Sequence, residues 1–127
     1  MRVHLGSDHA GFELKSHLIT WLTDHGYEPV DHGALEYDAD DDYPPFCIAA
    51  AQAAVDEPDS LGIVVGGSGN GEQIAANKVR GVRAALCNDL YTARLARAHN
   101  DANVLSIGAR VVGTGLAEDI LRTFLTT

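Results

Sequence analysis

The sequence has few cysteines and no long apolar run, and each shortage excludes a class of protein. Its two cysteines, Cys47 and Cys87, lie far apart and form no CxxC pair. That spacing argues against a disulfide framework and predicts a reducing, cytoplasmic environment. The N-terminal segment MRVHLGSDHAG lacks the apolar stretch of a signal peptide, and no other stretch is long enough to span a bilayer. We therefore expect neither secretion nor a membrane anchor.

Basic residues are also scarce. Nine lysines and arginines stand against 18 aspartates and glutamates, which gives a net charge of −9. Because no basic patch offsets the repulsion, this balance argues against nucleic acids and anionic membranes as partners. A small anionic ligand is still allowed, since it needs only local positive charge. The six histidines show no HxxxH or HxH spacing, so we expect no metal centre.

Short apolar runs alternate with segments of helical period along the 127 residues. Strands are expected at 3–5, 27–31, 61–65, 83–87 and 104–107. Helices are expected at 11–25, 44–55, 71–77, 89–98 and 115–124. This alternation is typical of an open α/β sheet with mostly parallel strands and helices on both faces. We expect a five-stranded sheet in a single domain, residues 1–127.

The stretch GGSGNGE, from Gly66 to Glu72, follows the apolar segment 61–65 and is the richest candidate site. Ligands of open parallel sheets bind beyond the carboxyl ends of the strands. Glycines let backbone N–H groups approach a ligand, and the next helix adds partial positive charge at its N-terminus. The loop therefore suits an anion, either a phosphate or an oxygen that becomes negative during a reaction. It lacks the Lys-Ser/Thr ending of a P-loop and the GxGxxG spacing of a dinucleotide site.

Glu72 narrows the choice of anion. A carboxylate repels a phosphate, but beside a carbon acid it can act as a base while the loop amides hold the enediolate that forms. Ser68 can donate a hydrogen bond to the same oxygen. The alternative is that Glu72 is a first-turn residue that only favours the helix dipole, and the spacing alone leaves both interpretations open.

Asp8 and His9 follow the first expected strand and open the first helix. A carboxylate and an imidazole at that point can move the hydroxyl protons of a sugar. Asp8 can also cap the helix through its N-terminal amides, and the two roles are compatible. His25 is interpreted as structural, because it lies in the last turn of the expected helix 11–25, where an imidazole suits the helix dipole. His32 follows the second expected strand, and its role stays open, with a structural one favoured.

Four segments together resemble ribose-5-phosphate isomerase of type B, a family that includes the lactose-pathway sugar-phosphate isomerases. They are SDHAG, DADDDYPPF, GGSGNGEQIAANK and ARAHNDANVLSIGAR, and they occur in the family's order across nearly the whole chain. The resemblance implies an aldose–ketose isomerase on a Rossmann-like fold, without metal or cofactor, that acts as a homodimer or a dimer of dimers. The simplest substrate is ribose 5-phosphate, converted to ribulose 5-phosphate in the pentose phosphate pathway.

The resemblance also implies roles for the glycine loop and its neighbours. Many members have a cysteine base at the position of Ser68, whereas others, especially actinobacterial ones, have serine there and a glutamate four residues later. Ser68 and Glu72 match the second pattern, so Glu72 is the implied base between C1 and C2. The residues that match the anion-holding part of the loop are Gly67, Ser68, Gly69, Asn70 and Gly71.

Other residues match the family's sugar and phosphate contacts. Asp8 and His9 match the pair that contacts the sugar, and Asp8 would assist ring opening. His99 matches the acid that opens the furanose ring, Asn100 its neighbouring ligand, and Arg110 a phosphate contact. Members usually continue past the position of Thr127 with a basic C-terminal helix. After Arg110 this sequence has only Arg122, to which we assign no site role.

His99 and Asn100 end the helix expected at 89–98, just before the last strand. Within one chain they would therefore lie at the edge of the sheet opposite the glycine loop, since a helix of ten residues spans roughly 15 Å. If they act, they reach the loop of a partner subunit, and the homodimer has shared active sites. The alternative for His99 is a helix-terminal residue that interacts with the dipole.

Three alternatives to this activity make different demands on the residues. The same chemistry on a tetrose, allose or galactose phosphate would need a different pocket length, which the sequence does not reveal. A non-catalytic sugar-phosphate binder would gain nothing from a carboxylate beside an anion. A flavodoxin-like electron carrier is disfavoured, because the loop GSDHAG has too few hydroxyls and glycines for a flavin phosphate.

Overall fold

Five parallel strands form the sheet, as the alternating pattern predicts. The computed structural model describes all residues, 1–127. The strands are β1 (Arg2–Ser7), β2 (Glu28–Asp31), β3 (Leu61–Gly66), β4 (Ala84–Leu86) and β5 (Val104–Gly108). Their order is β2-β1-β3-β5-β4, and every pairing is parallel. The expected α/β class is confirmed, and the sheet is parallel throughout rather than mostly so.

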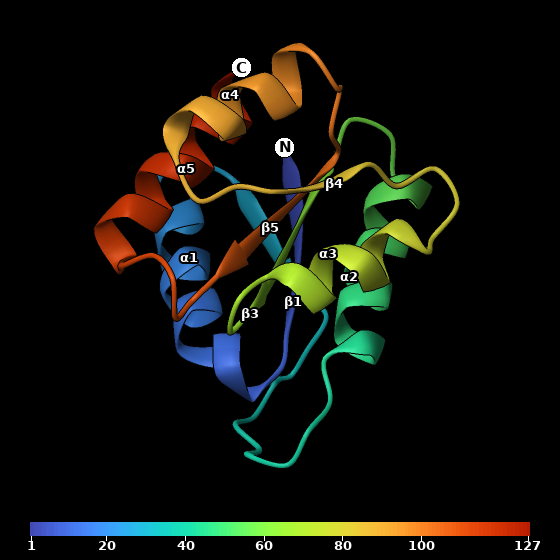
Figure 1. Cartoon of the computed structure of the whole chain (residues 1–127), viewed down its shortest axis with the longest axis vertical. Coiled ribbons are helices and arrows are strands. Elements are labelled where there is room, and N and C mark those ends of the chain that lie inside the picture. Colours follow the sequence, from blue (N-terminus) through green and yellow to red (C-terminus); the bar gives the residue numbers. More distant parts are fainter.

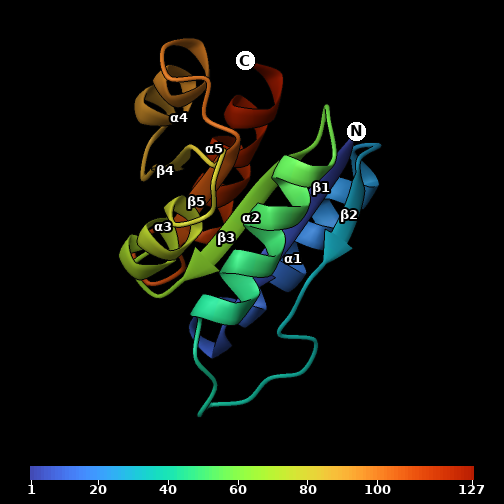
Figure 2. The same cartoon turned by 90° about the vertical axis from the view of Figure 1, so that its right-hand side faces the viewer.

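Helices cover both faces of the sheet. They are α1 (Phe12–Asp24), α2 (Pro44–Asp56), α3 (Asn70–Asn77), α4 (Leu90–Ala98) and α5 (Thr114–Thr126), and a short 3-10 turn, His9–Gly11, precedes α1. The helices α2 and α3 pack on one face, while α1, α4 and α5 lie on the other (Figures 1 and 2). None of these helices is long and apolar enough to cross a membrane.

The boundaries agree with the sequence analysis to within a few residues. The main difference is at β1, which continues to Ser7 because Ser7 pairs with Val65 of β3 and donates its N–H to the Gly33 carbonyl at 2.8 Å. The segment 9–11, expected as the start of the helix, is a 3-10 turn. Gly26 follows α1 with a φ of +85°, as expected of a glycine after a helix.

The two faces of the sheet are packed differently. The face under α1, α4 and α5 holds 21 buried apolar residues, among them the large side chains of α1 and α5. The other face meets α2, whose alanines bring the helix close to the strands. A Cβ atom at Gly6 would lie 2.2 Å from the carbonyl oxygen of Phe46, so glycine is required at that contact. Cys47 and Cys87 are buried free thiols, as expected.

One lysine lies inside the protein. Lys15 of α1 is fully buried, and its Nζ donates to Asp31 at 2.7 Å and to the carbonyl oxygen of Ala34. Ala34 in turn donates its N–H to Ser7 at 2.7 Å. The start of the loop 34–43 is therefore fixed to both α1 and the carboxyl end of β1.

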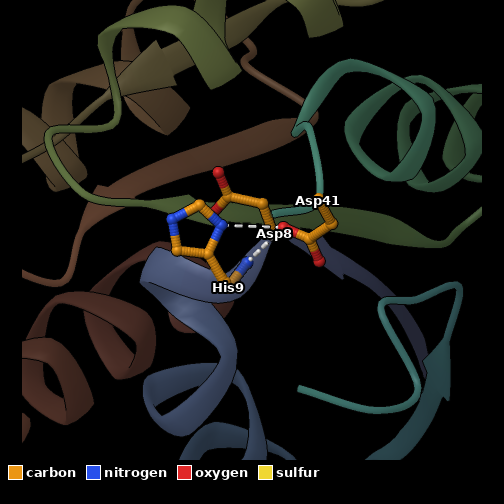
Figure 3. A group of neighbouring side chains, drawn as sticks. All are labelled: Asp8, His9 and Asp41. Carbon is orange, nitrogen blue, oxygen red and sulfur yellow. Dashed lines mark hydrogen bonds and ion pairs between the residues drawn. The ribbon is translucent and has the colours of Figure 1, made fainter. Parts of the chain in front are cut away.

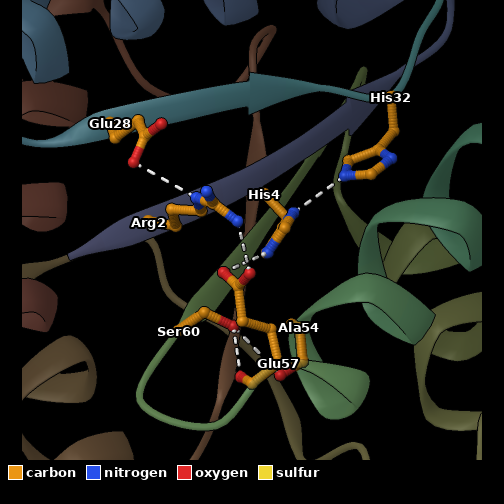
Figure 4. Close-up of polar contacts among 7 residues, drawn as sticks. All are labelled: Arg2, His4, Glu28, His32, Ala54, Glu57 and Ser60. Carbon is orange, nitrogen blue, oxygen red and sulfur yellow. Dashed lines mark hydrogen bonds and ion pairs between the residues drawn. The ribbon is translucent and has the colours of Figure 1, made fainter.

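A second polar network lies near the C-terminal end of α2 (Figure 4). His4, which is 5% exposed, places Nδ1 2.8 Å from Nε2 of His32 and Nε2 3.2 Å from the Glu57 carboxylate. Arg2 bridges Glu57 at 2.7 Å and Glu28 at 3.1 Å. Burial and the neighbouring His4 lower the pKa of His32, because both disfavour its charged form.

This network should make stability depend on pH in the histidine range. Since the pKa of His32 is lower in the folded chain, the unfolded chain takes up the proton first as the pH falls below ~6.5. The contribution of His32 to the free energy of unfolding should therefore decrease between pH 7.5 and pH 5, whereas His9, whose pKa is raised, contributes in the opposite direction. The measurement is urea unfolding of the wild type and of a His32 variant at both pH values. The lowered pKa of Glu57 adds nothing in this window, because its contribution is lost only below ~4.3.

His32→Gln should reduce this pH dependence, and the control His25→Gln, which changes an exposed histidine after α1, should not. Equal losses of stability in wild type and His32→Gln between the two pH values would contradict the assignment.

Candidate active site

The carboxyl ends of β1, β3 and β5 bring three predicted segments together. Asp8 follows β1, the glycine loop 66–72 follows β3, and Arg110 follows β5. Gly66 pairs with Gly108, so the two strands end at the same level. The loop 34–43 borders the same edge, at the bottom of Figure 1. The segments expected at the carboxyl ends of the strands therefore lie close together in space.

The glycine loop lies directly against the end of β5. A Cβ atom at Gly108 would be 2.4 Å from the carbonyl oxygen of Ser68, and Gly69 has a φ of +85°. The buried hydroxyl of Ser106 donates to the Gly69 carbonyl at 2.7 Å and holds the loop in this conformation. The backbone N–H groups of Gly67, Ser68 and Gly69 donate to no carbonyl in the chain. They are free to bind an anion.

Two polar side chains of the loop lie at its outer surface. Ser68 is exposed, and its Oγ accepts the N–H of Asn70 at 3.2 Å, which caps the start of α3. The hydroxyl proton of Ser68 remains available to a ligand. Asn70 is also exposed, in the first turn of α3. Both residues lie where the sequence analysis expects substrate contacts.

Glu72 is in the first turn of α3, but its side chain turns inward. It is 4% exposed, and its carboxylate lies so close over Gly66 that a Cβ there would be 1.5 Å from Oε1. Burial, and then the nearby charge of Asp8, raise its pKa. Cys47 lies beside both carboxylates, and burial raises its thiol pKa, so it is a poor nucleophile. A buried carboxylate with a raised pKa has the properties of a general base.

Asp8 is 6% exposed, and its Oδ1 accepts the N–H of Ala10 at 3.0 Å. This is the capping bond that the sequence analysis gives as the alternative role. Because Asp8 also contributes to the raised pKa of Glu72, capping and a place in the site occur together.

His9 is held by a residue of the loop 34–43 (Figure 3). Its backbone N–H and its Nδ1 each lie 2.8 Å from Oδ1 of Asp41. This contact raises the pKa of His9. Possible ligand atoms of Asp8, His9 and Asp41 lie within 4.8 Å of one another, close enough together to bind one metal ion. Nδ1 is however engaged as a donor to Asp41, so these residues fit a hydrogen-bonded group better than a ligand set.

Arg110 supplies positive charge beside the loop. Its backbone N–H donates to the Gly67 carbonyl at 3.0 Å, and its Nη1 lies 3.3 Å from the position of a Cβ at Gly67. The residue is exposed, and none of the ion pairs of the chain includes it. The guanidinium is therefore available to an anionic ligand.

His99 and Asn100 are not brought to the loop within one chain. His99 is the exposed C-cap of α4, and β5 begins shortly afterwards at Val104, which pairs with Gly62 at the amino end of β3. The loop begins at the other end of these strands, about 13 Å away by strand rise. Asn100 lines a cavity of about 530 Å³ between α3 and α4.

The structure adds three residues that the sequence analysis did not assign. Ser106 holds the Gly69 carbonyl, Asp41 holds His9, and Tyr43 packs on Gly71, where a Cβ would lie 2.6 Å from its hydroxyl oxygen. The signal for Ser106 is a hydroxyl in an apolar strand. Asp41 and Tyr43 lie in a run of acidic residues that suggests only a solvated loop.

The chain matches the ribose/galactose isomerase family over residues 3–127. A ribose-5-phosphate isomerase B of Mycolicibacterium paratuberculosis is 61% identical over 127 residues, which is 100% of this chain and 80% of the relative. That of Mycobacterium tuberculosis is 60% identical over the same residues, 78% of its length.

Solved structures agree with these matches. A Clostridium thermocellum ribose-5-phosphate isomerase B superposes with a TM-score of 0.94 at 46% identity, covering 100% of this chain and 85% of that one. The enzyme of Mycoplasma genitalium, described with bound ribulose-5-phosphate, gives 0.95 at 39% identity and covers 99% and 84%.

The hold of Ser106 on the glycine loop can be tested without a ligand. Ser106→Ala removes one buried hydrogen bond and should lower the free energy of unfolding by about 1 kcal/mol. Amide hydrogen exchange of Gln73, whose N–H donates to the same Gly69 carbonyl at 3.0 Å, should become faster, by roughly fivefold for the same free energy.

The matched control is Ser60→Ala, which removes a buried hydroxyl bonded to Ala54 and Glu57 at the far end of α2. It should cost similar stability and leave the exchange of Gln73 unchanged. Equal exchange of Gln73 in both variants would show that Ser106 does not hold the loop.

Proposed function

The chain belongs to the ribose/galactose isomerase family, and on that premise we propose that it interconverts ribose 5-phosphate and ribulose 5-phosphate with Glu72 as the base. It is an aldose–ketose isomerase, the activity named for relatives at about 60% identity along the full chain. The observation that carries the assignment of the base is the burial of the Glu72 carboxylate, at 4% exposure, under a loop with free amides.

The proton transfer follows from this arrangement. Glu72 removes the proton from C2 of the open-chain aldose, and the electron pair forms the C1–C2 double bond while O1 becomes negative. The free N–H groups of the loop and the N-terminus of α3 stabilise that oxygen. The O2 hydroxyl proton then passes to O1, Glu72 returns the carbon-bound proton to C1, and the electron pair left on O2 forms the carbonyl at C2. Ser68, with its hydroxyl proton free, donates to the enediolate oxygen.

The remaining contacts orient the sugar. Arg110 faces the loop from the end of β5 and binds the phosphate, because its guanidinium has no partner in the chain. Asp8 lies beside Glu72 and binds the sugar hydroxyls with His9, and Asp8 assists ring opening. Gly67, Gly69, Asn70 and Gly71 complete the substrate-binding loop. No step in this sequence requires a metal or a cofactor.

His99 and Asn100 act from a second copy of the chain. Both lie at the amino edge of the sheet, so they reach a glycine loop only across a subunit interface. The helices that border the cavity beside Asn100 expose apolar side chains, Ile74 on α3 and Tyr91 on α4, which are 61% and 63% exposed. These are the kinds of side chain that a dimer interface would bury. In the dimer, His99 of one subunit protonates the ring oxygen of the sugar held by the other.

The role of Glu72 predicts a specific loss. Glu72→Gln should reduce kcat by about 10³-fold, since a general base contributes roughly 10²–10⁴, and should abolish deuterium incorporation from D₂O at C1 and C2, followed by NMR. Because burial raises the pKa of Glu72, the ionised side chain costs stability at neutral pH. The Tm of Glu72→Gln at pH 7.5 should therefore equal or exceed that of wild type.

Glu36→Gln, which makes the same change at an exposed position of the loop 34–43, should leave turnover unchanged. Turnover with deuterium exchange in a folded Glu72→Gln variant would remove Glu72 from the mechanism.

The shared site predicts complementation between inactive variants. Glu72→Gln and His99→Ala each leave both sites of a homodimer defective. After unfolding and refolding of an equal mixture, half of the dimers are mixed, and each mixed dimer has one intact site. About one quarter of wild-type activity should return, measured against each variant refolded alone. Sites built within a single chain would give no recovery.

A further inference from the structure

The contact between His9 and Asp41 joins the substrate site to a loop that the reaction described above does not use (Figure 3). One carboxylate oxygen of Asp41 accepts two bonds from the same residue, from the backbone N–H and from Nδ1 of the ring, both at 2.8 Å. The backbone bond fixes where the residue sits, and the ring bond fixes how the imidazole is turned. Together they leave the ring little freedom about either side-chain torsion.

The bond also determines which ring nitrogen carries the proton. A carboxylate only accepts hydrogen bonds, so Nδ1 must be the donor. In neutral His9 the proton therefore lies on Nδ1, and Nε2 is the free nitrogen. On protonation Nε2 gains an N–H that no group of the chain accepts. A positively charged donor then lies on the side of the ring away from Asp41 (Figure 3).

The surroundings of Asp41 favour the charged form of the imidazole. The Asp41 side chain is 10% exposed, and its second oxygen, Oδ2, is buried without a hydrogen-bond partner. A half-satisfied buried carboxylate is costly unless a positive charge lies beside it. The only cationic group bonded to it is the imidazolium of His9.

The loop that carries Asp41 is anchored rather than free. At its start Lys15 holds the Ala34 carbonyl and Asp31, and at its end Tyr43 packs against Gly71 of the glycine loop. The ring of Tyr37 meets His9 edge-on, with centroids 6.5 Å apart. Asp41 is therefore presented to His9 by a segment that is tied to α1 and to the site.

Several charged groups face His9. Asp8 precedes it in the chain and, like Asp41, raises its pKa. Glu72, in the first turn of α3, lies beside Asp8. Arg110, from the end of β5, lies over Gly67 close to Ala10. The carboxylates around His9 thus outnumber the single guanidinium, and they favour the imidazolium.

From this geometry we infer that Asp41 is a positioning residue for the isomerase. It holds the His9 ring with Nε2 toward the substrate and favours the protonated imidazole, which donates to the anionic sugar phosphate. Asp41 touches no substrate atom itself. The inference depends on the proposed function only for the identity of the substrate, since tautomer and charge are properties of the free protein.

Two measurements on the free protein test the inference without any assay. In ¹H–¹⁵N NMR spectra, neutral His9 should show the Nδ1–H tautomer. In Asp41→Asn, the titration midpoint of His9 should move to lower pH, because the amide keeps a hydrogen-bond acceptor but removes the charge. The matched control is Asp40→Asn, which makes the same change at an exposed position of the same loop and should leave the titration in place.

Kinetics with ribose 5-phosphate give the second readout. In Asp41→Asn, KM should rise roughly tenfold, the effect of weakening one charge-assisted contact, while kcat changes less than about threefold. The loss of binding at alkaline pH, where His9 gives up its proton, should begin at a lower pH than in wild type. Asp40→Asn should leave KM within about twofold of wild type.

The outcomes separate this inference from the proposed function. An Nε2–H tautomer in wild type, or an unchanged His9 titration in a folded Asp41→Asn protein, would overturn the positioning role. A fall in kcat with unchanged KM would also overturn it. A wild-type protein that shows the tautomer and the shift but does not convert ribose 5-phosphate would refute the proposed substrate and leave the role of Asp41 supported.

Discussion

Close backbone packing between the glycine loop and the end of β5 is the constraint on which the site depends. Side chains at Gly66 or Gly108 would collide with the Glu72 carboxylate or with the Ser68 carbonyl. Because these two glycines have no side chain, the loop can lie against the ends of β3 and β5, within reach of the Ser106 hydroxyl. The same contact turns Glu72 inward and leaves the loop amides without partners. The proposed base and the proposed anion site are therefore two consequences of one packing arrangement, and neither can be shifted alone.

The electrostatics of the edge oppose stability and favour chemistry. Three carboxylates, those of Asp8, Asp41 and Glu72, are mostly buried at one edge of a chain whose net charge is already −9. Burial, and then the charge of Asp8, raise the pKa of Glu72, and the hydrogen bond to Asp41 raises the pKa of His9. A sugar phosphate would meet Arg110, the imidazolium and the free amides, while the carboxylates remain behind them. The folded chain thus tolerates a cost in stability at the edge where the proposed base and the cationic groups lie.

Local patterns account for the fold and for the glycine loop, but not for the groups that hold the loop. The spacing of apolar residues separates strands from helices well, because burial determines the pattern of both kinds of element. In β3, for example, every residue is buried. The 3-10 turn after β1 depends on contacts with β3 that the periodicity does not contain. Asp41 and Ser106 bond to residues 32 and 37 positions away. Their sequence neighbourhoods predict only a solvated loop and an apolar strand, so these roles become visible only when the segments are placed together.

The direction of α4 has a consequence for activity. In a right-handed crossover the helix runs opposite to the strands, so its last residues always return to the amino edge of the sheet. His99 and Asn100 occupy that end, whereas Glu72 and the glycine loop occupy the carboxyl edge. A site that needs His99 and Asn100 together with Glu72 and the glycine loop cannot be completed by one chain of this topology, whatever the loop conformations. Activity would then depend on assembly, and weakening the interface would remove turnover before it unfolds the subunit.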